Sequence, residues 1–215
     1  MTAWGVGCYD DGAARVPWEI SHEEIQRDMG TAAKTLAGLG IGAGDRVLFT
    51  SMLSEAGQFW PLIVGAMLSG AQLSCADANE GDAVRVAMFT RLIGYRAVLG
   101  ITPQILDGLD DLGRGYADVF AGVPVLGARP GAYERLRDAG LSPHWFVLCG
   151  PAVAVATAPG EAARVGGDEW ELASDGDRVL VTNRRDRATT FDRAPTGVRG
   201  QVSDGTAVLP FEREQ

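Results

Sequence analysis

Basic residues are scarce in this sequence, and the scarcity limits its partners. Lysine and arginine make up 19 of the 215 residues against 28 aspartates and glutamates, which sets the formal net charge at -9 at pH 7. No basic run interleaved with aromatic residues precedes the arginine-rich segment at 184–199. Because clustered positive charge is what holds nucleic acids, we expect no nucleic acid partner.

A long hydrophobic run is also missing. The longest apolar segment, FWPLIVGAML at 59–68, is about half of the ~20 residues that a membrane-spanning helix needs. The N-terminal MTAWGVGCYDDG has no basic region followed by an apolar stretch, as a secretory signal would have. We therefore expect a cytoplasmic protein without a membrane partner.

Cysteines are few and widely spaced. Cys8, Cys75 and Cys149 are odd in number and form no C-x-x-C pair. This pattern excludes a disulfide framework and gives no sign of a zinc or redox site. We expect reduced thiols and no metal centre.

What the sequence does contain is a regular alternation of helical and strand-like segments. Ser21 followed by Glu24 is a capping-box pattern, and apolar residues then recur at helical spacing up to Gly40, which predicts a helix. The short apolar runs that alternate with helical segments as far as residue 150 are DRVLFTS, AQLSCAD, RAVLGIT, VPVLGA and HWFVLCG. This alternation predicts an α/β fold with a parallel sheet flanked by helices.

Beyond residue 150 the pattern changes. The runs AVAVATA, DEWELAS and RVLVTN are separated by glycine and aspartate turns, with no helical segment between them. We place a boundary between Cys149 and Gly167, which divides the chain into an α/β domain at 1–150 and a small β-rich subdomain at 151–215. The C-terminal strands are expected to pair as an antiparallel unit.

The stretches at 36–73, with its GDRV turn, and at 168–200, with its TGVRG end, resemble the acyl-adenylate-forming enzymes, which include acyl-CoA synthetases, aryl-CoA ligases and nonribosomal adenylation domains. The first is LAGLGIGAGDRVLFTSMLSEAGQFWPLIVGAMLSGAQL, where a helix, a GDRV turn and strand, and a helix ending in GA follow one another as in that family. The second is DEWELASDGDRVLVTNRRDRATTFDRAPTGVRG, which is similar to a hairpin and R-Y-R-T-G-D-R-G stretch of phenylacetate-CoA-ligase-like members. The resemblance implies an α/β ligase scaffold.

The second motif departs from the family at one functional position. The motif residues that match are Arg193, Thr196, Gly197, Arg199 and Gly200. Val198 stands where the family has an acid that holds the ribose hydroxyls of ATP. Valine accepts no hydrogen bond, so the resemblance implies that this contact is lost.

Other ATP-handling parts of the family have no counterpart in the sequence. No phosphate loop ending in Pro-Lys-Gly is found, and at the position of the Tyr-Gly-x-Thr-Glu motif Gly150 is followed by PAV. The family's mobile C-terminal domain carries a lysine, whereas QVSDGTAVLPFEREQ follows Gly200 here and the sole lysine is Lys34. The resemblance therefore implies no ATP-dependent ligation by this chain alone, and no magnesium site.

His144 and Cys149 are the candidate catalytic residues. They lie at the two ends of the predicted strand HWFVLC, and ligands bind at the carboxyl ends of strands in open parallel sheets. A thiol and imidazole pair would suit thioester chemistry. Because the two positions face opposite sides of a strand, direct contact requires a bend, and a purely structural Cys149 remains the alternative.

An arginine cluster is the candidate ligand site. The cluster consists of Arg184, Arg185, Arg187 and Arg193, with Thr196 and Arg199 close by in the sequence. It could receive the 3′-phosphate of coenzyme A or a phosphopantetheine arm, since guanidinium groups pair with phosphate oxygens. The alternative is a solvated hairpin whose arginines are balanced by nearby aspartates.

Two functions fit these features. The first is a catalytically reduced ligase-like protein that binds an acyl or aryl thioester, a carrier protein or a complete ligase. The second is an ATP-independent acyltransferase or cyclase acting on a thioester-bound substrate. Because a truncated sheet exposes apolar surface, we also expect a homodimer or a heteromeric complex.

Overall fold

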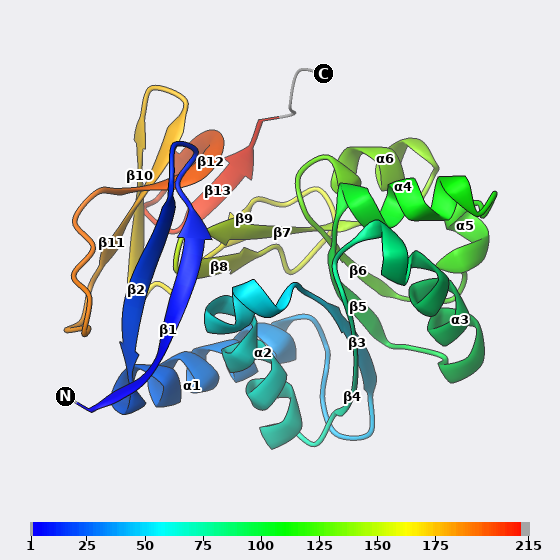
Figure 1. Cartoon of the computed structure of the whole chain (residues 1–215), viewed down its shortest axis with the longest axis horizontal. Coiled ribbons are helices and arrows are strands. Elements are labelled where there is room, and N and C mark those ends of the chain that lie inside the picture. The colour runs from blue at the N-terminus through cyan, green and yellow to red at the C-terminus, as the bar shows by residue number, and fades with distance from the viewer. Residues whose placement is uncertain (1, 212–215) are drawn as a thin grey trace.

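The computed structural model describes residues 2–211 and contains one large mixed sheet, a separate hairpin and two groups of helices (Figure 1). The large sheet has 11 strands in the order β10-β11-β12-β13-β9-β8-β7-β6-β5-β3-β4. The N-terminal hairpin consists of β1 (Ala3–Asp10) and β2 (Arg15–Ser21), which pair antiparallel.

One half of the large sheet is parallel. Its strands are β3 (Arg46–Thr50), β4 (Gln72–Ala76), β5 (Ala97–Ile101), β6 (Val125–Ala128) and β7 (His144–Cys149). They alternate with α2 (Ala56–Leu68), α3 (Ala83–Ile93), α4 (Pro103–Asp111), α5 (Tyr116–Val119) and α6 (Ala132–Asp138). The predicted parallel sheet flanked by helices is confirmed.

The other half of the sheet is antiparallel and starts at β7. Its strands are β8 (Ala152–Val155), β9 (Ala163–Arg164), β10 (Trp170–Asp175), β11 (Arg178–Asn183), β12 (Ala194–Ser203) and β13 (Ala207–Pro210). The predicted C-terminal antiparallel unit is confirmed, and the switch from parallel to antiparallel pairing falls between β7 and β8. The sheet continues through this point, and the division at residue 150 stays a prediction.

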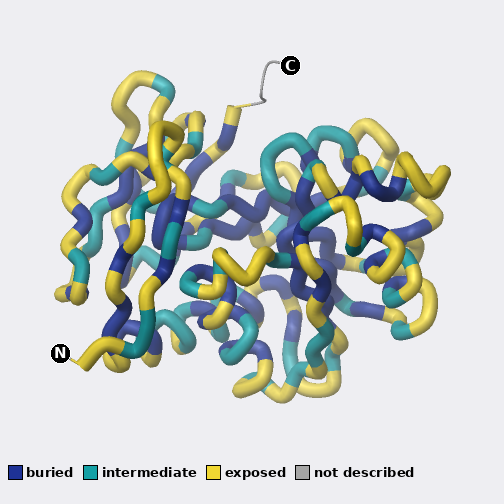
Figure 2. The backbone as a smooth tube through the Cα atoms, viewed as in Figure 1, coloured by how far each residue is buried: buried dark blue, intermediate teal, exposed yellow. Residues whose placement is uncertain are grey.

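Alternating side chains of the central strands feed two apolar cores. Val47 and Phe49 of β3 pack with α2 and α1 (His22–Gly38), whereas Leu48 between them packs with α3 and α4 on the other face. This is the period of two that a strand buried on both faces requires. Figure 2 shows the buried positions running through these central strands while the outer loops and helix faces are exposed.

Local sequence signals explain where the helices begin. At the start of α1 the Ser21 side chain accepts a hydrogen bond from the Glu24 N–H, and the Glu24 carboxylate accepts from the Ser21 N–H, which confirms the predicted capping box. Thr102 caps α4 in the same way through the Ile105 N–H. Among residues 2–211, no helix combines the length and hydrophobicity that crossing a membrane demands.

Candidate functional site

The second motif lies on β12 and on the loop that leads into it. Thr196 is buried, and its hydroxyl donates to Val179 O at 2.8 Å while accepting from the Val198 N–H at 3.2 Å. The hydroxyl therefore joins β12 to β11. This use of Thr196 is structural, because both partners are main-chain groups of the sheet.

Gly197 allows the N-terminal hairpin to approach β12. Its φ is 75°, and a Cβ at this position would overlap the carbonyl oxygen of Asp10 in the hairpin. Glycine alone combines a left-handed backbone with the space for such an approach. The Thr-Gly pair of the motif thus serves packing in this chain.

Val198 is half-buried and packs against the larger hydrophobic core. An apolar side chain in this setting offers no hydrogen-bond acceptor to a ribose. Its neighbour Arg199 is exposed and forms an ion pair with Asp177 at the turn before β11. An exposed pair of this kind contributes little binding or stability on its own.

The predicted ligand residues fall into two groups. Arg184 and Arg185 directly follow β11, and the Arg193 N–H donates to Thr182 Oγ1 at 3.0 Å, so these three arginines gather at one end of β11. Arg199 pairs with the residue that begins β11. Since a strand of this length extends on the order of 17 Å, Arg199 does not join the other three.

Acidic groups already engage two of the clustered arginines. Arg184 Nε lies 3.4 Å from a Glu171 carboxylate oxygen, and Arg185 Nε lies 3.6 Å from a Glu169 carboxylate oxygen. The side chains of Arg184 and Arg185 remain about half exposed. They can still turn toward an anion, because each ion pair is long and accessible to water.

A nearby open groove has the size of a ligand site. Its volume is about 580 Å³, and it lies between the hairpin and the loop at 188–190. The residues that line it are Val6, Pro17, Trp18, Glu19, Ala188, Thr189 and Thr190. Grooves of roughly 300–1,000 Å³ with apolar walls hold small organic ligands. The three arginines at the end of β11 belong to the same loop, which runs from β11 to β12.

His144 is buried at the start of β7. Its Nδ1 lies 3.0 Å from Ala156 O. Burial lowers the pKa of His144, and the hydrogen bond with Ala156 O only partly offsets this shift. The ring is therefore neutral at pH 7 with a proton on Nδ1, which fixes its orientation. One nitrogen of the candidate base is thus committed to the main chain.

Cys149 is fully buried at the other end of β7. It belongs to the larger core, whereas Phe146, on the same face of β7 as His144, belongs to the other core. The structure therefore places the His144 and Cys149 side chains on opposite faces of the sheet. Burial raises the pKa of Cys149 to about 12, which disfavours the thiolate needed for nucleophilic attack.

Native Cys149 is expected to resist alkylation. With a pKa of about 12, about one thiol in 10,000 is ionised at pH 8, since each pH unit changes the ratio tenfold. Peptide mapping by mass spectrometry after iodoacetamide treatment should find Cys149 modified at least 100-fold more slowly in native buffer than in urea. Equal rates in the two conditions would contradict a sealed thiol.

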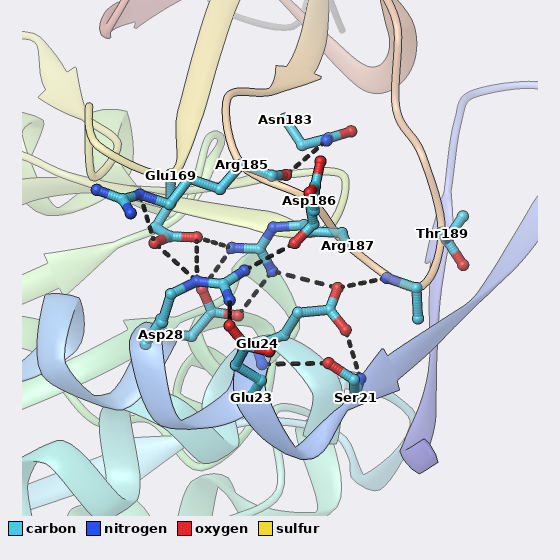
Figure 3. Close-up of polar contacts among 12 residues, drawn as sticks. Ser21, Glu23, Glu24, Asp28, Glu169, Asn183, Arg185, Asp186, Arg187 and Thr189 are labelled. Carbon is cyan, nitrogen blue, oxygen red and sulfur yellow. Dashed lines mark hydrogen bonds and ion pairs between the residues drawn. The ribbon is translucent and has the colours of Figure 1, made fainter. Parts of the chain in front are cut away.

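A buried network of charged side chains joins α1 to the loop after β11, and the sequence analysis did not single it out (Figure 3). Arg187 is only 3% exposed and donates from both terminal nitrogens to Asp28, at 2.6 and 2.9 Å. It also donates to Glu169 at 2.8 Å, and its guanidinium carbon lies 3.9 Å from the centre of the Trp170 ring. Arg187 thus neutralises two carboxylates at once, and its inclusion in a phosphate-binding cluster is wrong, because the buried carboxylates occupy its guanidinium group.

Glu24 extends this network to the start of α1. One of its carboxylate oxygens accepts from the Ser21 N–H in the capping box, and the other accepts from the Ala188 N–H at 3.0 Å. Arg27, one turn further along α1, contacts Glu169 at 3.1 Å. Glu24 therefore both caps the start of α1 and binds the loop between β11 and β12, which is distant in the sequence.

Burial shifts the ionisation of this network. Burial raises the pKa of Asp28, and the hydrogen bonds and charge of Arg187 act in the opposite direction. Burial also disfavours the charged form of Arg187, but the hydrogen bonds to Asp28 and the acidic charges outweigh it and raise the pKa of Arg187. Perturbed groups of this kind occur at active sites and in structural ion-pair networks.

A small cavity lies next to Asp28, between α1, α2 and β8. Its volume is about 50 Å³, and Thr31, Gln58 and Trp170 are among its walls. The buried Gln58 donates to Gly150 O at 3.2 Å, and its side-chain oxygen has no partner within residues 2–211. A space of this size accommodates a few water molecules but no acyl group or nucleotide. Within the same residues, no cluster of acidic, histidine or cysteine side chains is suited to hold a metal.

Comparison with known proteins gives a relationship in structure and none in sequence. No family model matches the chain, and no curated protein is similar to it in sequence. A 2-hydroxyisobutyryl-CoA ligase solved with an acyl-AMP is similar at a TM-score of 0.69 and 14% identity, over 97% of this chain and 50% of that one.

Two other solved structures give the same result. The o-succinylbenzoate CoA synthetase from Bacillus subtilis, bound to a product analogue, matches at a TM-score of 0.63 and 12% identity, over 99% of this chain and 49% of its own. An anthranilate CoA ligase solved with anthranoyl-AMP matches at 0.65 and 12%, over 95% and 46%. The chain thus has the α/β fold of acyl-CoA ligases and spans about half the length of the ligases it matches.

Proposed function

We propose that this is a catalytically reduced, cytoplasmic relative of the acyl-CoA ligases that acts by binding. Its ligand would be an acyl or aryl thioester of coenzyme A or phosphopantetheine, presented free, on a carrier protein or in complex with a complete ligase. The observation that carries the proposal is Val198, an apolar side chain packed against the core where the resemblance expects the acid that holds ATP. The shared ligase fold supports the choice of ligand class.

The other motif residues support binding over adenylation. Thr196 and Gly197 are used in packing, and Arg199 is paired with Asp177. Adenylation requires donors and cations placed where charge develops on the phosphates, and these residues are committed elsewhere. The alternative of an ATP-independent enzyme has weaker support, because Cys149 is sealed in the core and lies on the opposite face of the sheet from His144.

The arginines at the end of β11 and the open groove together support a thioester ligand. Arg184, Arg185 and Arg193 would meet the phosphates of coenzyme A, for which paired guanidinium donors are well suited. The apolar wall of the groove, which includes Trp18, would receive the acyl or pantetheine part. Both features belong to the loop that runs from β11 to β12.

Pyrophosphate exchange tests the catalytic half of the proposal. We expect no exchange above background with any acyl or aryl acid tested, in the wild type or in Val198→Asp, because restoring one acid does not rebuild the other phosphate contacts. The Val198→Asp variant also tests whether the loss of this one acid is enough to explain the absence of adenylation. ATP-dependent turnover by the wild type would overturn the proposal.

Native mass spectrometry tests the binding half. We expect coenzyme A and acyl-CoA adducts on the wild type, and at least a tenfold weaker affinity in Arg184→Ala/Arg193→Ala, since each lost phosphate contact removes a charge-assisted hydrogen bond. Arg91→Ala/Arg114→Ala, which removes two exposed arginines outside this loop, is the charge-matched control. Binding that is equal in all three proteins would exclude the arginine cluster as the site.

A further inference from the structure

The strand β4 ends the large sheet with an open edge. Within residues 2–211 it pairs only with β3. The Gln72 N–H donates to Asp45 O, just before β3, at 2.8 Å, and the Ser51 N–H, just after β3, donates to Ala76 O at 3.2 Å. Main-chain groups of successive strand residues point to opposite edges. The N–H and C=O groups of Leu73 and Cys75 therefore point away from the sheet.

Nothing in β4 protects this edge from pairing. Its sequence, QLSCA, contains no charge and no proline, and its register with β3 runs from Gln72 to Ala76 without a bulge. Natural end strands are usually blunted by charges, prolines, bulges or a covering segment. An uncharged, regular and uncovered edge is suited to receive another strand.

The opposite end of the sheet shows the contrast. The end strand β10 carries Glu171 and Asp175, and its Leu172 N–H donates to Gly205 O at 2.7 Å in the turn between β12 and β13. Charge and a covering turn thus close that edge. Of the two end strands, β4 alone is left open within residues 2–211.

Exposed apolar side chains flank β4 on both helices connected to it. Met67 and Leu68 end α2 just before β4, and α3 exposes Val84, Met88 and Leu92, which are spaced four residues apart on one face. Such a stripe is normally buried against a neighbour.

Arg46 at the start of β3 ties α3 to this edge. Its Nη1 donates to Ile93 O, the last residue of α3, at 2.6 Å, and its Nε donates to the Gln72 side chain of β4 at 3.4 Å. The C-terminal end of α3, near the exposed Leu92, therefore lies close to the start of the open strand.

We propose that a second copy of this chain pairs with β4 antiparallel across a two-fold axis, so that two sheets become one. In this register Ser74 lies opposite Ser74 of the second copy, and Leu73 lies opposite Cys75 of the second copy. Leu73 and Cys75 then exchange both of their outward groups, which makes four main-chain hydrogen bonds. The pattern is self-complementary, as a two-fold contact requires.

The charge of the protein favours this edge over other surfaces as the contact between copies. Each chain carries a formal net charge of -9, so two copies repel one another. A contact centred on β4 brings two uncharged strands together, because the β4 sequence QLSCA contains no acidic residue. The apolar side chains at the ends of α2 and α3 lie beside this contact.

Cysteine cross-linking tests the register. In the proposed dimer the two Ser74 Cα atoms form a non-hydrogen-bonded pair roughly 4.5 Å apart, within the range that a disulfide bridges. We expect Ser74→Cys to give a disulfide-linked dimer under mild oxidation on a non-reducing gel. Gln72→Cys is the control, because the two Gln72 positions would lie roughly 14 Å apart. The native Cys75 pair is diagonal at roughly 7–8 Å and should not cross-link.

Sedimentation of the wild type tests the edge itself. We expect a dimer at micromolar concentration that Cys75→Pro converts to a monomer of unchanged circular dichroism, because proline removes an outward N–H that β3 does not use. Cys75→Ser should remain dimeric. A monomeric wild type, a dimer that survives Cys75→Pro, or a failure of Ser74→Cys to cross-link would each overturn the proposal, whatever other protein the chain binds.

Discussion

Replacing Arg187 with methionine is expected to lower the free energy of unfolding by about 3–5 kcal/mol. Methionine keeps much of the volume but leaves the carboxylates of Asp28 and Glu169 buried without the cation that now contacts both. Glu169 keeps its contact with Arg27, so the uncompensated charge of Asp28, rather than lost packing, produces most of the penalty. Urea unfolding followed by circular dichroism measures it.

Arg185→Met is the matched control for this result. Arg185 lies two residues away in the same loop, but its side chain is 58% exposed and its ion pair with Glu169 is long. An exposed pair of this kind contributes about 0–1 kcal/mol. Equal losses in Arg185→Met and Arg187→Met would show that burial of the network has no energetic consequence.

The penalty in Arg187→Met should depend on pH. Burial raises the pKa of Asp28 in the wild type, and removing Arg187 takes away the effect that opposes it, so the folded state of the variant holds this proton more tightly. A folded pKa above the unfolded one means that stability falls as pH rises between the two. The difference between variant and wild type should therefore be largest at neutral pH. It should shrink as pH falls toward about 3.9, the ordinary value for aspartate.

Replacing Gly197 with alanine is expected to cost about 2–5 kcal/mol. Its left-handed backbone penalises a side chain by about 1–2 kcal/mol, and the clash of the new Cβ with Asp10 O adds about 1–3 kcal/mol. Because the clash is with the hairpin, we also expect faster amide hydrogen exchange in β1 and β2. Thermal unfolding and hydrogen exchange by mass spectrometry measure the two effects.

Gly176→Ala separates the two causes of that loss. Gly176 has a similar φ of 61°, but a Cβ there would meet no atom within 4 Å. Only the backbone penalty of about 1–2 kcal/mol should appear, with no change of exchange in the hairpin. If Gly176→Ala and Gly197→Ala behaved alike, the approach of the hairpin to β12 would not be what requires Gly197.

The ordered α/β part of the fold follows from local signals in the sequence. The Ser21 and Glu24 capping box and the alternation of short apolar runs with helices act within a few residues of one another, so they can be seen in the sequence. They predict the helix that begins after Ser21, which the structure ends at Gly38, and the parallel strands in their correct order along the chain. The N-terminal hairpin was missed, because its Tyr9, which contacts Trp18 across the hairpin, packs against the distant Phe191.

The candidate site depended on contacts that the sequence does not show. The arginine cluster at 184–199 was visible, but not that Arg187 is buried against Asp28 of a helix at the other end of the chain. The motif at 191–200 was visible too, but not that Thr196 and Gly197 are consumed by packing. The spacing of apolar residues and the capping of helices are local properties that a sequence determines by itself. Desolvation and ion pairing depend on which distant groups surround a side chain, and only the tertiary structure decided them.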